Sequence, residues 1–263
     1  MEIFNAIGLE IPKGKTINDL AEDAERRGEA SLSTRSGGTI HGRCWRIGFG
    51  LEVWTTLYES ATGEVFHADC RPGFRARYTQ NLSRWFLYED EADGEAAVAG
   101  CVENHPDEIF FQLQNLTETG TKIFERKFLT VGLCGLAYRA RVAAADDEAL
   151  EWRRLSETAG NSDADQADWR LSGCVINYNA LRNPFSGSDL YWIHLDLGNF
   201  ELEILVNRRR LIGDKLLRVG ANVRADVWLQ GHIVAESTFL SSYEGVDWSG
   251  NAADFWKNYK KLN

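Results

Sequence analysis

Two His-x-Asp triplets are the residues of this chain best suited to acid–base chemistry. His67 and Asp69 form the first triplet, and His194 and Asp196 form the second. On a β-strand, residues two apart point to the same face, so each histidine would lie beside its carboxylate. Such a pair could act as a general base, or supply two of the three or four ligands that a zinc site needs. Neither triplet has a third ligand nearby, so we expect no bound metal and no cofactor.

A second group of polar residues lies on one face of the longest alternating segment, which runs from Val219 to Val234. Apolar and small residues occupy every second position, which is typical of a strand with one dry and one wet face. The wet face is therefore our predicted ligand-binding surface, to which we add a tryptophan that lies opposite another apolar stripe. The predicted binding residues are Trp54, Arg224, Asp226, Trp228, Gln230 and His232.

A third candidate is the segment from Arg71 to Trp85, where arginines are interleaved with aromatic residues. This composition can bind single-stranded nucleic acid by stacking and charge, and it is our weaker alternative. The whole chain carries a formal charge of −10, however, which repels a phosphate backbone. An arginine-covered strand is the simpler interpretation, and we do not expect nucleic acid as a partner.

Composition and cysteine usage limit the class of protein. The chain has 263 residues, 44% of them hydrophobic, with 4 Pro and 24 Gly, which suits a sizeable β core with glycine turns. The five cysteines are scattered, without metal-binding or disulfide spacing. No signal peptide or membrane-spanning run is recognisable. We therefore expect a cytoplasmic protein with reduced thiols and no membrane partner.

The elements that must position these residues are mostly strands. We predict a mainly β fold, β-rich α+β, with antiparallel barrel- or sandwich-like sheets and three short helices. Residues 1–38 form an N-terminal helix and linker, in which Thr16 and Asp19 resemble a capping box and Gly28 ends the helix. Residues 39–145 form a first β region, including one long strand that bends at Gly48 and Gly50. Residues 146–168 form a helix and linker, and residues 169–263 form a second β region closed by a helix from about Ala252.

A further hypothesis is that the two β regions are related halves. Three short segments of the first region resemble segments of the second in the same order, and duplication would produce such matches. The matched pairs are 42–44 with 172–174, 67–69 with 194–196, and 128–132 with 216–220. The hypothesis predicts that His67 and His194 occupy equivalent places in their sheets.

No motif of a known catalytic class is present. The first expectation is therefore a non-enzymatic binding or interaction protein, which engages a protein or small-molecule ligand through aromatic and charged groups on exposed sheet faces. The alternative is a hydrolase-type enzyme on a β scaffold that uses the two His/Asp pairs.

Overall fold

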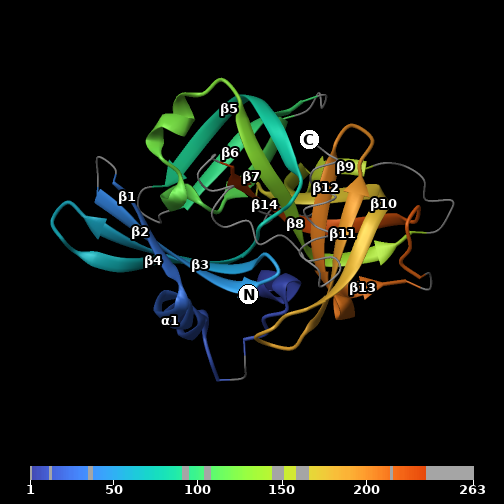
Figure 1. The fold of residues 1–263 in the computed structure, drawn as a ribbon, viewed down its shortest axis with the longest axis horizontal. Coiled ribbons are helices and arrows are strands. Elements are labelled where there is room, and N and C mark those ends of the chain that lie inside the picture. The colour runs from blue at the N-terminus through green and yellow to red at the C-terminus, as the bar shows by residue number, and fades with distance from the viewer. Residues whose placement is uncertain are drawn as a thin grey trace, which may run out of the picture.

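The computed structural model describes residues 2–11, 14–34, 38–90, 95–103, 108–143, 151–157, 166–213 and 216–234. Strands make up 62% of these residues and helical turns 14%, so the prediction of a mainly β fold is confirmed. The strands form a four-stranded sheet and a larger ring-like sheet (Figure 1). Among the described residues, every helix is too short or too polar to cross a membrane.

The chain begins with two helical elements and continues as a series of strands, with four short helical turns between them. The helical elements are η1 (Glu2–Ile7), α1 (Ile17–Arg27), η2 (Leu116–Glu118), η3 (Thr121–Glu125), η4 (Leu155–Glu157) and η5 (Arg208–Arg210). The strands are β1 (Glu29–Thr34), β2 (Gly38–Gly48), β3 (Leu51–Ser60), β4 (Val65–Phe74), β5 (Thr79–Asp90), β6 (Glu95–Val102), β7 (Glu108–Leu113), β8 (Leu129–Val142), β9 (Glu151–Arg154), β10 (Asp168–Arg182), β11 (Asp189–Asp196), β12 (Glu201–Asn207), β13 (Leu211–Ile212) and β14 (Asn222–Ile233).

The N-terminal helix α1 has the ends that its sequence predicts. Thr16 is the N-cap, its side chain accepts from the backbone N–H of Asp19, and the Asp19 carboxylate accepts from the backbone N–H of Thr16. This reciprocal pair is a capping box, and Gly28 caps the other end. Ala21 and Ala24 are the buried residues of α1, so the helix packs through small side chains.

The four-stranded sheet has the order β1-β2-β3-β4, and each strand is antiparallel to the next. The expectation of one long strand through residues 45–53 is wrong. Gly48, Phe49 and Gly50 all have positive φ, and they reverse the chain between β2 and β3. Glycine reaches these angles without strain, so two glycines in a strand-like sequence mark a turn here.

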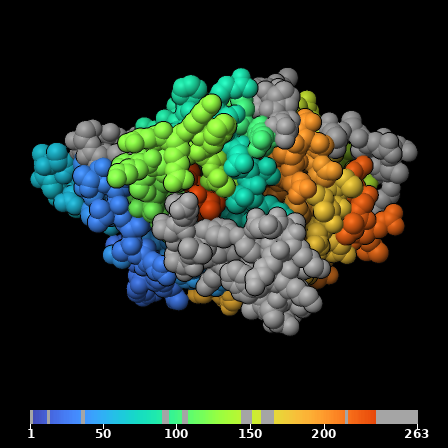
Figure 2. Space-filling view, turned by 45° about the horizontal axis from the view of Figure 1, so that its top comes forward, coloured from blue at the N-terminus to red at the C-terminus, as the bar shows by residue number. Residues whose placement is uncertain are grey.

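The larger sheet consists of two five-stranded rings that share two strands. In the first ring β8, β5, β6, β7 and β14 pair in succession, and β14 pairs back with β8. In the second ring β14, β10, β11, β12 and β8 pair in the same way. The long β8–β14 ladder belongs to both rings, which pack side by side (Figures 1 and 2).

The two rings repeat one pattern of pairing. A meander of three strands, β5-β6-β7 or β10-β11-β12, leads to a long strand that pairs antiparallel with the first strand of its own meander. The third strand of each meander pairs in parallel with the long strand of the other half. In this pattern β8 corresponds to β14, but the third segment match is out of register, because residues 129–132 lie inside β8 whereas residues 216–220 precede β14.

The other two segment matches are wrong. His67 lies on β4, at the edge of the four-stranded sheet, whereas His194 lies on β11, inside the second ring. The repeated pattern begins at β5, so residues 39–74 have no counterpart in it. Duplication of the whole regions 39–145 and 169–263 is therefore not supported, because His67 and His194 occupy different places in the fold.

Two buried apolar clusters hold the molecule together. The first contains alternate residues of the ring strands, such as Val223, Val227 and Ile193, and fills the rings. The second lies outside the rings, where η1, the four-stranded sheet and the second ring meet, and includes Phe4, Phe74 and Trp192. Because the sheet covers the outer face of the rings, β14 is largely buried on both faces.

Two of the three expected helices are not observed among the described residues. The helix expected over residues 146–158 is wrong where it can be compared, because Glu151–Arg154 is strand β9 and only a short turn follows it. Trp152 stacks on Trp169 with ring centroids 4.4 Å apart, so packing on β10 overrides the helical pattern. The helix expected from Ala252 lies outside the described residues.

Candidate functional site

The six predicted binding residues do not form one wet surface. Those on β14 share one face as predicted, but Trp54 and Trp228 are only 1% and 9% exposed, so the expectation of exposed aromatics is wrong at both positions. The four-stranded sheet covers the half of β14 that carries Trp228, Gln230 and His232. The half that carries Arg224 and Asp226 opens onto a pocket of about 310 Å³.

This arginine pocket is built on the outer face of the second ring. Its polar lining groups come from four adjacent strands, and Ile212 and two alanines complete it. The lining residues are Arg139, Ala140, Arg141, Glu151, Arg153, Arg170, Ile212, Arg224, Ala225 and Asp226.

Strand register explains why the charged groups converge. In one row across the sheet, Arg139 of β8 faces Asp226 of β14, which faces Arg170 of β10, which faces Arg153 of β9. Directly opposed residues lie about 5 Å apart and point to the same side. A second row carries Arg141, Arg224, Ser172 and Glu151. The pocket therefore lies over two adjacent rows of charged residues.

The two acids of the pocket hold the arginines in place. Arg170 Nε and Arg139 Nε donate to the two oxygens of Asp226 at 2.6 and 2.7 Å. Burial alone would raise the pKa of Asp226, but the hydrogen bonds and charges of these arginines outweigh it and lower the pKa.

Glu151 has the same role in the second row. Its carboxylate lies 2.6 Å from Arg153 Nε and 3.4 Å from Arg224 Nε. Five guanidinium groups surround two carboxylates, so the lining has a formal charge of +3 in a protein of charge −10. The arrangement suits an anion, and both of its described carboxylates are paired with arginines.

Sequence reasoning identified Arg224 and Asp226 but missed the other arginines. The alternation Arg139-Ala140-Arg141 was a readable signal for two of them. Arg153 and Glu151 were hidden because residues 146–158 were interpreted as a helix.

The buried half of β14 carries a polar network centred on Glu52. This carboxylate accepts from Trp54 Nε1 at 2.9 Å and Arg75 Nε at 2.8 Å, and it lies 3.0 Å from His232 Nε2. Burial alone would raise the pKa of Glu52, but Arg75 and His232 hold it far below its usual range. Burial lowers the pKa of His232, although Glu52 opposes this effect.

This network joins the two sheets, because Glu52 comes from β3 and His232 from β14. Arg75 also reaches Glu118 at 3.2 Å, so it is enclosed by two carboxylates. Gln230 is fully buried and donates to the carbonyl of Phe74 at 2.6 Å. These hydrogen bonds hold the two sheets together, so the network has a structural role.

The two His/Asp pairs do not form a common site. His67 Nε2 lies 3.0 Å from Thr55 Oγ1, and Asp69 accepts from Arg71. His194 is buried against Tyr78, with ring centroids 3.9 Å apart, and burial lowers its pKa to about 4. Asp196 is exposed and accepts from the backbone N–H of Gly198.

Glu203, which sequence reasoning also missed, is fully buried near His194. It accepts from the backbone N–H groups of Arg77 and Tyr78 and from Trp192 Nε1. Burial raises the pKa of Glu203 to about 7, although these hydrogen bonds oppose the shift. Its contacts tie the connection between β4 and β5 to β12.

The Arg71–Trp85 segment does not present its first arginines to solvent. Arg71 and Arg75 are 5% and 7% exposed, and both are paired with carboxylates inside the protein. The observation that motivated nucleic-acid binding is therefore absent at these two positions.

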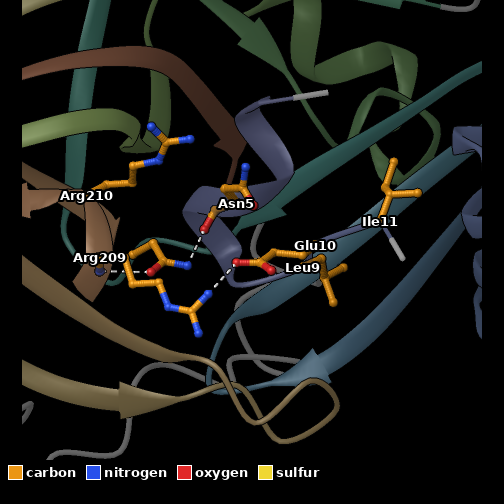
Figure 3. Close-up of a pocket in the computed structure, with 7 residues that line it drawn as sticks. Asn5, Leu9, Glu10, Ile11, Arg209 and Arg210 are labelled. Atoms are coloured by element: carbon orange, nitrogen blue, oxygen red, sulfur yellow. Dashed lines mark hydrogen bonds and ion pairs between the residues drawn. The ribbon is translucent and has the colours of Figure 1, made fainter. Parts of the chain in front are cut away.

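A larger, open pocket of about 610 Å³ lies between the N-terminal segment and η5 (Figure 3). Arg209 reaches across it to Glu10 at 3.0 Å. Asn207 donates to the carbonyl of Asn5 at 3.1 Å. These contacts anchor the N-terminal segment to the second ring.

Within the described ranges, no group of three or more His, Cys, Asp or Glu side chains is placed to hold a metal. No family of known proteins matches this chain, and a comparison with curated proteins finds no significant relative.

Proposed function

We propose that this is a non-enzymatic binding protein of the cytoplasm that takes a small, multiply charged anion in the arginine pocket. This proposal keeps the predicted binding function and two of its predicted residues, Arg224 and Asp226. It replaces the expected aromatic contacts with guanidinium groups. The main observation that supports the proposal is the convergence of five arginines on one pocket of an acidic protein.

The charge and the rigidity of the pocket support a ligand with at least two negative charges. Planar guanidinium groups form paired hydrogen bonds with carboxylate and phosphate oxygens. Arg170 and Arg139 are held by Asp226, so little side-chain entropy is lost when an anion binds. Phosphate and carboxylate groups share this recognition chemistry.

The hydrolase alternative has less support. Its four residues lie on β4 and β11, and their side chains are engaged in separate local contacts. A general base must reach the proton that it removes, and a buried histidine with a lowered pKa stacked on a tyrosine is poorly placed to do so.

Isothermal titration calorimetry with inorganic pyrophosphate and with citrate tests the proposal. We expect 1:1 binding that weakens between 50 and 200 mM salt, since charge dominates the interaction. Replacing two of the exposed arginines, in the double variant Arg139→Gln/Arg153→Gln, should weaken binding at least tenfold. The matched control is the double variant Arg84→Gln/Arg126→Gln, which removes two exposed arginines outside this pocket.

Two results would overturn the proposal. One is the absence of binding by either anion at low salt. The other is an equal loss of affinity in the pocket double variant and in Arg84→Gln/Arg126→Gln, because binding would then follow overall charge and not the pocket.

A further inference from the structure

The last residues of the Arg71–Trp85 segment lie at the surface, unlike its first arginines. Arg84 is exposed on β5, and Phe86, directly after the segment, is 62% exposed. A second run of cationic and aromatic residues, in η3 and the turn that follows it, lies against this part of β5. We call the two together the basic aromatic surface. Its residues are Arg84, Trp85, Phe86, Lys122, Phe124, Arg126, Lys127 and Phe128.

Contacts between Trp85 and the second run hold the surface together. Trp85 Nε1 donates to the carbonyl of Arg126, 41 positions away, at 3.2 Å, and its ring centroid lies 6.2 Å from that of Phe124. The ammonium nitrogen of Lys127 lies 5.4 Å from the ring centroid of Phe128, which is 54% exposed. The second run leads directly into β8, which pairs with β5, so two distant parts of the sequence form one surface.

A β-bulge explains why β5 presents these side chains. The pairing of β5 with β6 shifts between Ser83 and Phe86, so that Arg84 and Trp85 both lie opposite Gly100. Arg84 has a φ of 48°, a left-handed conformation that arginine rarely adopts. A Cβ at Gly100 would lie 2.9 Å from Trp85 Cβ, so the glycine makes room for the bulge. Bulges re-aim side chains, and strained residues are concentrated at functional sites, so this local geometry supports a binding surface.

The cations of the basic aromatic surface are exposed and are not paired with carboxylates of the described residues. Residues 84–86 and 122–128 carry four cations and one carboxylate, Glu125, which gives a formal charge of +3. The first arginines of the Arg71–Trp85 segment, in contrast, are paired with carboxylates inside the protein. The surface therefore attracts a polyanion, although the whole chain has a charge of −10.

We propose that the basic aromatic surface binds single-stranded nucleic acid. Charge complementarity favours a polyanion, and the exposed phenylalanine rings favour one whose planar groups can stack on them, and a single strand has both properties. Unpaired bases stack on Phe86 and Phe128, and the phosphates between them contact the neighbouring cations. A duplex keeps its bases stacked on one another and offers only its phosphates. The site is independent of the arginine pocket, because an open surface holds only a chain that makes many contacts at once.

Fluorescence anisotropy with a labelled oligothymidylate of twelve nucleotides tests the proposal. We expect the wild-type protein to bind it, and we expect a DNA duplex of the same length and poly-L-glutamate to compete at least tenfold more weakly. The logarithm of the affinity should fall with the logarithm of the salt concentration with a slope of about −2 to −3, since each phosphate contact on a single strand contributes about 0.7.

Double variants separate stacking from charge. Phe86→Ala/Phe128→Ala should weaken binding at least tenfold, whereas Phe86→Tyr/Phe128→Tyr keeps both rings and should bind within about twofold of the wild type. Lys122→Gln/Lys127→Gln should reduce the steepness of the salt dependence by about 1.4, because two phosphate contacts are lost.

The matched control is Phe66→Ala/Phe185→Ala, which removes two phenylalanines that are 44% and 50% exposed elsewhere on the molecule and should bind normally. Phe86 and Phe128 are more than half exposed, so their replacement should leave the melting temperature unchanged. Absence of binding by the wild type would overturn the proposal. So would equal competition by poly-L-glutamate or by the duplex, because the surface would then recognise charge alone, and so would normal binding by Phe86→Ala/Phe128→Ala.

Discussion

Glu203 should make the stability of this protein fall as pH rises towards neutrality. In the unfolded chain this carboxyl loses its proton near pH 4.5, whereas in the folded protein burial raises its pKa to about 7. Between these values the folded state binds more protons, so the free energy of unfolding decreases as pH increases. The difference of about 2.5 pKa units corresponds to about 3 kcal/mol, lost between pH 4.5 and pH 7.

His194 should act in the opposite direction over much of the same range. Burial lowers its pKa from 6.5 to about 4, so the unfolded chain binds a proton that the folded protein does not. Stability linked to His194 is therefore complete above pH 6.5 and is lost as pH falls towards 4. The two groups oppose each other between about pH 4.5 and pH 6.5, and their joint contribution is nearly flat there.

Single variants separate the two contributions. We propose urea unfolding at pH 5, 6, 7 and 8 for the wild-type protein, Glu203→Gln and His194→Phe. Glu203→Gln removes the titrating carboxyl, so its stability should rise with pH where the wild type is flat. His194→Phe keeps a ring beside Tyr78 but cannot be protonated, so the decline caused by Glu203 should emerge.

The amide of Glu203→Gln directs a donor at Trp192 Nε1, which should destabilise this variant at every pH without altering the slope. The slope is therefore the decisive quantity. Parallel curves for the wild type and Glu203→Gln would refute the reasoning, because they would show that the buried carboxyl has an ordinary pKa.

Three other predictions concern buried groups. Glu52→Gln removes the charge that pairs with buried Arg75, and urea unfolding should show a loss of about 3–5 kcal/mol. In Gly231→Ala the added Cβ would lie 2.7 Å from a buried phenylalanine ring, so the same measurement should show a loss of about 1–3 kcal/mol. A thiol reagent at pH 8 should label only Cys101 and Cys174 in the native protein, because the other three cysteines are buried.

Each of these predictions has a matched control. Glu59→Gln removes the charge of a half-exposed pair with His41 and should cost less than about 1 kcal/mol. Gly63→Ala adds its Cβ in open space at an exposed turn, so it should show backbone strain alone. Equal losses in Glu52→Gln and Glu59→Gln, or in Gly231→Ala and Gly63→Ala, would contradict the dependence on burial. Rapid labelling of Cys70 would contradict it too, because burial raises the pKa of this thiol to about 12.

The sequence was sufficient to predict those elements whose defining residues lie close together in the chain. The capping box of α1, the turn-and-strand composition and the alternation of β14 are set by residues close together in the chain, and all three were readable. The turn at Gly48–Gly50 was misread because the apolar alternation continues unchanged from β2 into β3. Local pattern alone does not distinguish a bend from a reversal.

The sites depended on pairing between distant strands, which the sequence does not encode locally. Arg139, Arg170 and Asp226 come together only because β8 and β10 lie on opposite sides of β14. The burial of Trp54 and Trp228 follows from packing of one sheet on another, which alternation cannot reveal. The predicted binding surface was therefore correct as a strand face and wrong as a solvent surface.

The shared β8–β14 ladder makes the two rings mutually dependent. Each ring takes one strand from the other half of the chain, so neither half contains all the strands of a closed ring. Cutting the chain between β9 and β10 would give two fragments with unpaired strand edges, which should remain open alone and reassemble when mixed. Each half of the chain therefore completes the ring of the other half, as subunits do in a dimer that exchanges terminal strands.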